Sequence, residues 1–239
     1  MCTASVRGTG MARLGHMSDP EPRYRSGLLT QAALVVAASQ FADKARKGVD
    51  TPYLSHLLAV SALVMEHGGS EVQAAAGLLH DVIEDVGVTG DALEQLLVDH
   101  GAPRSEVAAV VAIVESTTDG QPDQQRDEAS WPLRKLAYIK SLRHKPSDDS
   151  SLLVSLADKV HNAESTVQIV RSGTTATEMY AAKHFNAKAP QQKWYYTELA
   201  AVFRRHLGSI PAAEPLVRRL ETAITEIFVG VEAEEPVER

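Results

Sequence analysis

The stretch EVQAAAGLLHDVIED, residues 71–85, combines an apolar stripe with four ionisable side chains at one end. Its apolar residues recur every three or four positions, which predicts a helix that buries one face in a core. His80 and Glu84 would stand one turn apart on this helix, as would Asp81 and Asp85. Carboxylates at the negative end of a helix dipole are unfavourable unless a cation lies nearby. The stretch therefore indicates either a solvated acidic helix end or a cation site.

Helical spacing of apolar residues continues through most of the chain after Ser26, whereas the alternation typical of β-strands is absent. The fold class is therefore expected to be all-α. The connection at residues 117–130 is longer and more polar than two neighbouring helices need, which makes it a candidate lid. The predicted helices lie at about residues 28–45, 54–67, 71–85, 90–99, 106–115, 132–143, 151–171, 190–206 and 213–229.

The chain of 239 residues is 44% hydrophobic, which is enough to bury the core of one large domain. Residues 1–25 mix Gly, Ser, Pro and Arg without periodicity and are predicted to form a flexible tail. Residues 26–207 carry the helical domain. Residues 208–239 are expected to add a last helix and a frayed acidic tail that pack on this domain or follow it.

The overall charge narrows the possible partners. Lys and Arg number 24 against 31 Asp and Glu, a formal net charge of -7, which argues against a surface that coats a nucleic-acid polymer. Any phosphate chemistry would need a local basic pocket. The single cysteine, Cys2, excludes a disulfide framework and a Cys-rich zinc site. No apolar run is long enough for a membrane span, so we expect a cytoplasmic protein without a membrane partner. The oligomeric state stays open.

Two other stretches supply partners for the ionisable residues of 71–85. TPYLSHLLAV places His56 in the first turn of an apolar helix, and SLLVSLADKVHNAES places Asp158 in a helix whose preceding turns are almost wholly apolar. A charged Asp in such a helix is costly unless it is paired or bound to a metal. Two histidines and two carboxylates from three helices would form a mixed nitrogen and oxygen site, suited to Mn²⁺, Fe²⁺ or Zn²⁺.

These motifs resemble the H…HD…D pattern of the HD-domain phosphohydrolases, and in particular the hydrolase domain of RelA/SpoT-type alarmone enzymes. The resemblance spans about residues 28–171 and rests on three stretches. The first is the Arg46-Lys47 pair, which is followed by Pro52-Tyr53 and His56. The second is HDVIED at residues 80–85, and the third is LADKVHN at residues 156–162. It implies an all-α HD-domain bundle with a metal site in its core. The implied ligands of Mn²⁺, or of another divalent metal, are His56, His80, Asp81 and Asp158. None of the motifs of the synthetase domain is found, so a stand-alone small alarmone hydrolase is expected.

The resemblance also implies roles for residues around the metal. Glu84 and Asp85 match the catalytic Glu-Asp pair of the family, and Arg46 and Lys47, at the end of the first helix, match residues that contact guanine and phosphate. His161 could be a core histidine and is not counted as a ligand, and the aromatic run at residues 194–196 is expected to anchor the core. Two positions depart from the family, which often has His and Gln where this chain has Phe41 and Lys44. Further candidates for the substrate pocket are Tyr53, Lys159, Asn162 and Ser165.

The function implied is hydrolysis of the 3′-pyrophosphate of guanosine tetra- or pentaphosphate to give pyrophosphate and GDP or GTP. Two alternatives stay open at this point. The first is an HD phosphohydrolase that acts on another nucleotide, such as NADPH at its 2′-phosphate or a nucleoside monophosphate. The second is a non-catalytic regulator that binds metal or alarmone.

Overall fold

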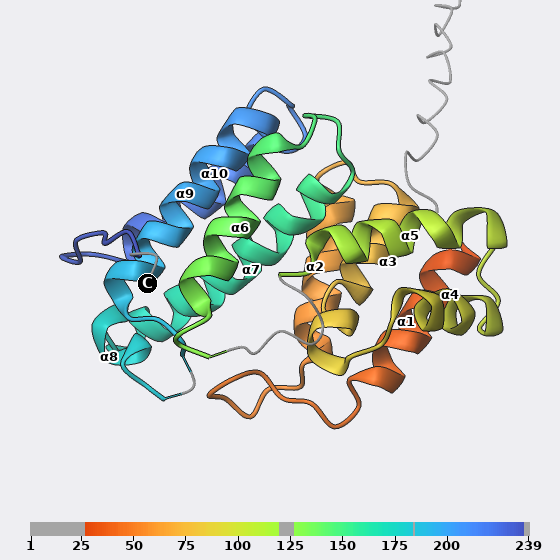
Figure 1. The fold of residues 1–239 in the computed structure, drawn as a ribbon, viewed down its shortest axis with the longest axis horizontal. Helices are drawn as coiled ribbons and strands as arrows, with labels where there is room; N and C mark the ends of the chain where they lie inside the picture. Colours follow the sequence, from red (N-terminus) through yellow and green to blue (C-terminus); the bar gives the residue numbers. More distant parts are fainter. Residues whose placement is uncertain (1–26, 120–126, 184, 237–239) are drawn as a thin grey trace, which may run out of the picture.

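The computed structural model describes residues 27–119, 127–183 and 185–236, and these residues form helices without a named strand (Figure 1). The all-α expectation is thereby confirmed. The predicted tail at residues 1–25 and the middle of the candidate lid, residues 120–126 of 117–130, lie outside the described residues. The elements are α1 (Leu28–Gln40), α2 (Leu54–Glu66), α3 (Glu71–Leu79), η1 (Val82–Val86), α4 (Gly90–Asp99), α5 (Arg104–Thr117), α6 (Trp131–His144), α7 (Ser151–Arg171), α8 (Ala176–Tyr180), α9 (Ala189–Leu207) and α10 (Glu214–Ile227).

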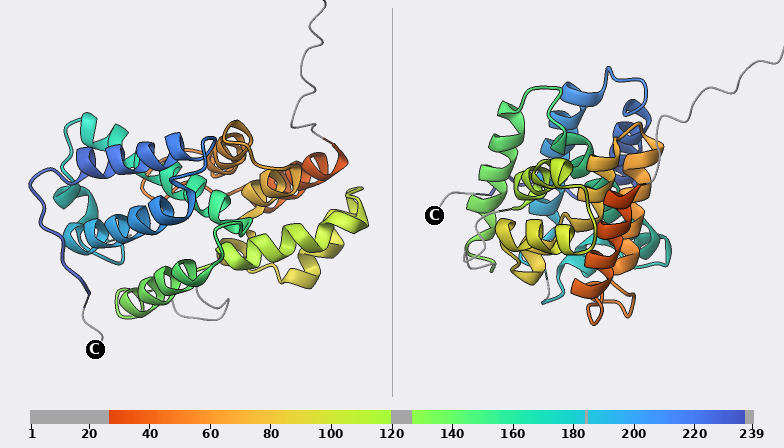
Figure 2. Two further views of the ribbon diagram at one scale, coloured as in Figure 1. Left: turned by 90° about the horizontal axis from the view of Figure 1, so that it is seen from above. Right: turned by 90° about the vertical axis from the view of Figure 1, so that its right-hand side faces the viewer.

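The helices form two groups that lie side by side, α1 to α5 in one and α6 with α8 to α10 in the other (Figures 1 and 2). Helix α7 packs against both groups, because it contacts α2, α3 and α5 as well as α9 and α10. Its first eight residues, Ser151 to Asp158, are all buried. A helix with apolar residues on every face needs such a central position, and α7 therefore carries Asp158 into the interior.

Close packing of α2 on α3 brings two of the predicted metal ligands together. Helix α3 is rich in small residues, and a Cβ added at Gly77 would lie 3.2 Å from the Cα of Ser61 on α2. A glycine at this point lets the two backbones approach closely. The rings of His56 and His80 consequently lie with their centroids 5.0 Å apart.

The first helix is shorter than its predicted range of 28–45 and ends at Gln40. Phe41 is buried and stacks on Tyr53 across the following loop, with ring centroids 5.0 Å apart, so the chain leaves the helical path there. Arg46 and Lys47 therefore lie in a loop. The sequence-based expectation that they end the first helix is wrong. The loop is closed by an antiparallel bridge between Ala45 and Pro52 and by backbone hydrogen bonds from Arg46 to Thr51 and from Tyr53 to Lys44.

The predicted helix at 71–85 is also interrupted. Helix α3 ends at Leu79, and after His80 and Asp81 the chain forms a single π-helical turn, η1, which stops at Gly87 with a φ of 82°. Wide turns of this kind change the direction in which successive side chains point and recur at functional sites. The predicted continuous helix is therefore wrong, although Asp81 and Asp85 still stand one turn apart, because the backbone N–H of Asp85 donates to the carbonyl of Asp81 at 2.7 Å.

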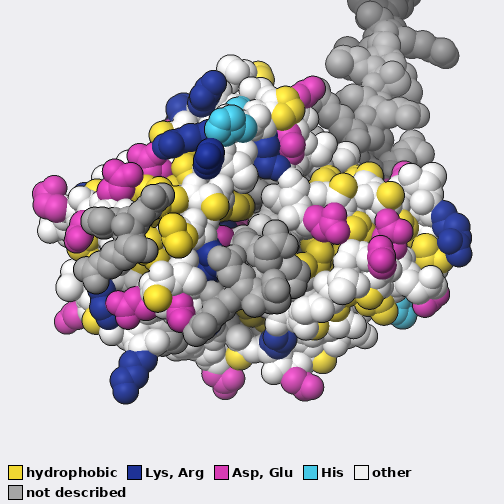
Figure 3. Space-filling view, in the orientation of Figure 1, with side chains coloured by type: hydrophobic (Ala, Val, Ile, Leu, Met, Phe, Trp, Pro, Cys, Tyr) yellow, Lys and Arg dark blue, Asp and Glu magenta, His cyan; other side chains and the backbone are white. Residues whose placement is uncertain are grey.

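The end of the described chain is more ordered than a frayed tail. Helix α10 packs on α7 and α9, and beyond it the backbone N–H of Glu234 donates to the carbonyl of Pro190 at the start of α9. Helix α8 was not predicted, although its capping box of Thr175 and Glu178 is a recognisable start signal. On the face shown in Figure 3, acidic and basic side chains are interspersed. Among the described residues, no helix is both long and apolar enough to span a membrane.

Candidate metal centre

Two histidines and two aspartates from α2, α7 and the turn after α3 converge at one point. The Nε2 atom of His80 lies 2.9 Å from Oδ2 of Asp81 and 3.6 Å from Oδ1 of Asp158. The Nε2 atom of His56 lies 3.6 Å and 3.2 Å from the same two oxygens. One ligand atom each from His56, His80 and Asp158 fit within 4.8 Å of one another, a spacing that could hold a metal ion. The structure thus brings together the four residues that the sequence singled out.

The orientation of His80 fits a metal ligand. Its Nδ1 lies 2.9 Å from the carbonyl oxygen of Gly77, which can only accept, so Nδ1 carries a proton and donates it. Such an outer hydrogen bond fixes the ring of a ligating histidine. Its Nε2 is buried and has no hydrogen-bond partner among the described residues, although Oδ2 of Asp81 lies 2.9 Å away. A cation would satisfy this nitrogen.

The local field favours positive charge. Burial alone would lower the pKa of His80, but the carboxylates of Asp81 and Asp158 hold it well above its ordinary value. Burial would raise the pKa of Asp158, whereas the Lys159 ammonium and the two histidines hold it well below the usual range. The carboxylates that stabilise a proton on His80 would stabilise a divalent cation in the same place.

Tyr53 supports this centre from the start of α2. Its hydroxyl donates to Oδ2 of Asp81 at 2.7 Å, and burial, followed by the charge of Asp81, raises its pKa. The two positions that depart from the family pattern are both used here. Phe41 stacks on the Tyr53 ring, and the Lys44 ammonium donates to the backbone carbonyl of Asp85 at 2.5 Å.

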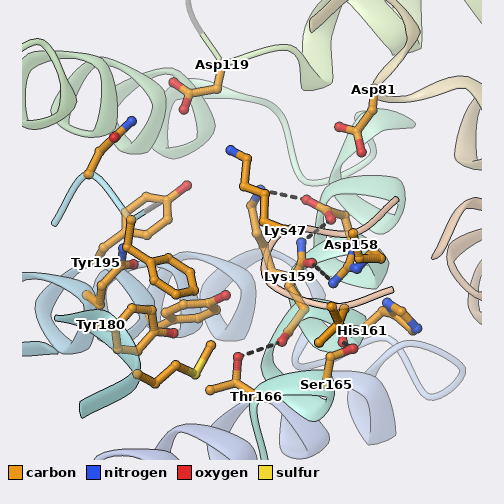
Figure 4. A pocket seen from close by; sticks show the side chains of 18 of the residues that line it. Lys47, Asp81, Asp119, Asp158, Lys159, His161, Ser165, Thr166, Tyr180 and Tyr195 are labelled. Atoms are coloured by element: carbon orange, nitrogen blue, oxygen red, sulfur yellow. Dashed lines mark hydrogen bonds and ion pairs between the residues drawn. The ribbon is translucent and has the colours of Figure 1, made fainter. Parts of the chain in front are cut away.

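A chain of hydrogen bonds joins the metal centre to the predicted nucleotide pocket. Lys159 donates to Oδ2 of Asp158 at 2.6 Å, and the side-chain amide of Asn162 donates to Oδ1 at 2.5 Å (Figure 4). Asn162 in turn accepts a hydrogen bond of 2.9 Å from the Arg46 guanidinium. Asp158 is therefore held on both oxygens before any ligand binds, and Arg46 folds back over α7.

His161 is a further polar residue that α7 brings to this region. Its Nδ1 lies 2.7 Å from Nδ1 of His56. Burial, and then the neighbouring charges of His56 and Arg46, lower its pKa to about 4, so the ring is neutral at pH 7. The expectation of a core histidine is too simple, because His161 contacts a predicted metal ligand directly and is half-buried.

A cavity of about 630 Å³ opens beside the metal centre. This volume lies within the range of small-molecule sites. Of the predicted site residues, only His56 and His80 lie behind its wall. The other ten all line it: Arg46, Lys47, Tyr53, Asp81, Glu84, Asp85, Asp158, Lys159, Asn162 and Ser165.

Sequence reasoning missed one side of this cavity. Arg134 and Lys135 on α6 both contact Oδ2 of Asp119, and the backbone N–H of Asp119 donates to Oε2 of Glu84 at 3.2 Å. A pair of basic residues in the otherwise apolar stretch LRKLAYI is the signal that could have found them. Two of the expected core aromatics, Tyr195 and Tyr196, are buried but also line the cavity, and Tyr195 faces Asp119 in Figure 4.

The Asp119 cluster gives a stability prediction. Replacing Asp119 by Ala leaves the buried Arg134 and the partly buried Lys135 on α6 without this carboxylate, and the expected loss is about 3–5 kcal/mol in the free energy of unfolding. The matched control is Glu198→Ala, which removes the partner of the half-exposed Arg143 and should cost at most about 1 kcal/mol. Urea unfolding at neutral pH measures both changes. Equal losses in the two variants would contradict the structural role of Asp119.

The pH dependence of this difference follows from the pKa of Asp119. Burial opposes ionisation, but the charges of Lys135 and Arg134 hold the pKa of Asp119 below its ordinary value. Its stabilising contribution is therefore complete above the unfolded carboxyl pKa of about 3.9 and is lost as the pH falls towards the lowered value. The difference in the free energy of unfolding between wild type and Asp119→Ala should therefore become smaller only in that acidic range.

Comparison with known proteins places the fold in a family. Residues 33–203 match the family model described as HD domain. A solved structure described as a metazoan ortholog of SpoT that hydrolyses ppGpp superposes with a TM-score of 0.61 at 21% identity, over 85% of this chain and 97% of that one. A Listeria monocytogenes structure superposes with a TM-score of 0.54 at 23% identity, over 74% and 99%. At these identities the two structures show a common fold.

Curated relatives are longer proteins. A probable guanosine-3′,5′-bis(diphosphate) 3′-pyrophosphohydrolase of Synechocystis is 32% identical over 132 residues, which is 54% of this chain and 16% of the relative. A GTP pyrophosphokinase of Streptomyces coelicolor is 27% identical over 195 residues, 80% of this chain and 21% of the relative. The chain thus spans about a fifth or less of these two proteins.

Proposed function

This chain belongs to the HD-domain family, and on that premise we propose that it removes the 3′-pyrophosphate from guanosine tetra- or pentaphosphate, releasing pyrophosphate and GDP or GTP. The observation that carries the proposal is the convergence of two aspartates on the wall of a cavity and two histidines just behind them, in a cavity that Arg46 and Lys47 also line. The names of the Synechocystis relative and of the metazoan SpoT ortholog support the same reaction. We place it in the cytoplasm, which the single cysteine favours.

The proposed cofactor is Mn²⁺, held by His56, His80, Asp81 and Asp158. Mixed imidazole and carboxylate donors suit this ion, although other divalent metals share the preference. A divalent cation bound there would neutralise pyrophosphate charge and lower the pKa of a coordinated water towards neutrality. The remaining roles fall to the protein's own side chains.

Glu84 and Asp85 are proposed to orient and deprotonate the attacking water. Both lie on η1 and line the cavity beside Asp81. The backbone N–H of Asp119 donates to one Glu84 oxygen and so orients this carboxylate at the cavity wall. Burial and the charge of Asp81 raise the pKa of Asp85, which favours a role in holding a proton.

Substrate capture is proposed to depend on a local cationic lining. A net charge of -7 repels a nucleotide polyanion at long range, so attraction must come from basic groups inside the cavity and the bound cation. Asn162 and Ser165, which line the cavity from α7, are proposed to contact a ribose, and Tyr53 to act through its hydrogen bond to Asp81. The basic groups on the cavity wall are Arg46, Lys47, Arg134, Lys135 and Lys159.

The experiment that tests the proposal is a substrate panel with purified protein and Mn²⁺. We expect guanosine tetraphosphate to release pyrophosphate and GDP, and pentaphosphate to release pyrophosphate and GTP. Faster turnover of NADPH or a nucleoside monophosphate would make the chain an HD phosphohydrolase of another nucleotide. Alarmone binding without turnover under any divalent metal would make it a regulator. Either result would overturn the proposed reaction.

The basic loop between α1 and α2 gives a prediction about recognition. Lys47→Ala should raise KM at low salt and lose most of this effect at high ionic strength, because its contact with phosphate is Coulombic. Arg46→Ala should weaken discrimination between guanine and adenine alarmones at all salt concentrations, because it removes a stacking plane worth roughly 1–3 kcal/mol. The measurement is kcat/KM for both nucleotides across a salt series.

The matched control for this series is Arg218→Ala, because Arg218 is exposed on α10 and pairs with Glu214 at 2.9 Å, outside the cavity. It should leave KM and base preference unchanged. An Arg46→Ala variant that keeps the full guanine preference would place the base elsewhere in the cavity, away from the loop.

A further inference from the structure

The two histidines of the metal centre have different partners behind them. Behind His80 lies the carbonyl oxygen of Gly77, which only accepts hydrogen bonds. Behind His56 lies another imidazole, with 2.7 Å between the Nδ1 atoms of His56 and His161 and 4.8 Å between the ring centroids. His56 is almost fully buried, with an exposed fraction of 1%, so this nitrogen has little access to water. His161 is therefore the group that satisfies Nδ1 of His56.

A hydrogen bond between two ring nitrogens requires one donor and one acceptor. The carbonyl behind His80 permits a single direction, so the proton stays on Nδ1 of that ring. The contact between His56 and His161 can run either way, because each Nδ1 can donate or accept. The direction of this hydrogen bond depends on whether the other ring nitrogen of His56, Nε2, carries a proton or binds a metal.

The surroundings of Nε2 of His56 distinguish the metal-free centre from the metal-bound centre. Without a metal, a proton on Nε2 of His56 can be donated towards Oδ1 of Asp158, 3.2 Å away, and His161 can then donate from its Nδ1 to His56. A nitrogen that ligates a metal carries no proton. With a cation on Nε2, the proton of a neutral His56 must sit on Nδ1, and His161 must accept it.

We propose that His161 is the positioning residue of the metal centre: it accepts the Nδ1 proton of His56 and so presents Nε2 to the cation, and its own tautomer changes when the cation binds. The inference rests on the proposed function, because it requires that His56 ligates a metal. It adds a residue that touches neither the metal nor the reacting atoms. His161 also lines the cavity. Its change of tautomer would therefore couple metal binding at His56 to the hydrogen bonding that the nucleotide pocket offers.

The first test is calorimetry of Mn²⁺ binding to nucleotide-free protein. His161→Phe keeps an aromatic ring but removes the acceptor, and should weaken Mn²⁺ binding by about 10–100-fold, the usual effect of losing such a partner. His161→Asn keeps an acceptor, because its Oδ1 is as many bonds from the backbone as Nδ1 of histidine, and should stay within a few-fold of wild type. The matched control is His100→Phe, at an exposed position after α4.

The second test uses wild-type protein and so does not depend on a variant that folds. Two-bond ¹H–¹⁵N correlation spectra of histidine-labelled protein report which ring nitrogen is protonated. On titration with diamagnetic Zn²⁺, His161 should change to a tautomer with a bare Nδ1 and a protonated Nε2. His80 should keep its Nδ1 proton throughout.

The outcomes separate the two proposals. Absence of Mn²⁺ and Zn²⁺ binding by wild type would overturn the metal site, and the proposed function with it. Wild-type binding that persists unchanged in His161→Phe, or a His161 that keeps its Nδ1 proton in the metal-loaded protein, would overturn only the role of His161. Weakened binding in His161→Phe, recovery in His161→Asn and the tautomer change together would establish it.

Discussion

Asp158→Ala is expected to abolish Mn²⁺ binding and turnover together. Asp158 supplies an oxygen 3.2 Å from Nε2 of His56 and 3.6 Å from Nε2 of His80, so its removal opens the centre between both imidazoles. It also releases Lys159 and Asn162, which are held by the two oxygens of this carboxylate. Losing one of the four proposed ligands would also misplace any water at the metal.

Calorimetry with Mn²⁺ and a pyrophosphate-release assay measure the two losses. His80→Ala should behave in the same way, and it leaves the contacts of Asp158 with α7 intact. Asp91→Ala removes an exposed carboxylate at the start of α4 and should change neither quantity. Unchanged Mn²⁺ affinity in Asp158→Ala would remove this residue from the metal site, whatever happens to the rate.

Glu84→Gln is expected to keep metal and substrate binding but to lower turnover by about 10²-fold or more, the scale of a positioned acid or base. Glutamine retains the size of the side chain and an oxygen that can accept from the Asp119 backbone N–H, which lies 3.2 Å from Oε2 of Glu84. The fold around η1 should therefore survive. The substitution removes the negative charge and, with it, the ability to take a proton.

Single-turnover kinetics with saturating Mn²⁺ separate this effect from binding. Glu94→Gln, an equivalent change at an exposed position of α4, should leave the rate constant unaltered. If Glu84→Gln keeps a near wild-type rate while its Mn²⁺ affinity collapses, Glu84 is a ligand and not a base. Asp85 would then be the remaining candidate for water activation.

Much of the helical framework follows from local sequence. The predicted helices at 90–99 and 151–171 coincide with α4 and α7, because each has a clear apolar period and breakers at both ends. The candidate ligand residues could also be named from sequence, since ionisable side chains in apolar helices are costly without partners. Helix boundaries failed where distant contacts overrode local preference. Stacking of Phe41 on Tyr53 accompanies the early end of α1, and the turn at His80 interrupts the helix that begins at Glu71.

The sequence by itself determined the fold class, because periodicity reports which side chains are buried, and its motifs carried the resemblance that named the candidate site residues. Only the tertiary structure decided which of them touch. The hydrogen bond from Tyr53 to Asp81 joins residues 28 positions apart, and the contact from His56 to His161 joins residues 105 apart. The basic residues Arg134 and Lys135 likewise reach the cavity only through the packing of α6. Periodicity shows that a face is buried but not what it is buried against, and that information lies in helix packing.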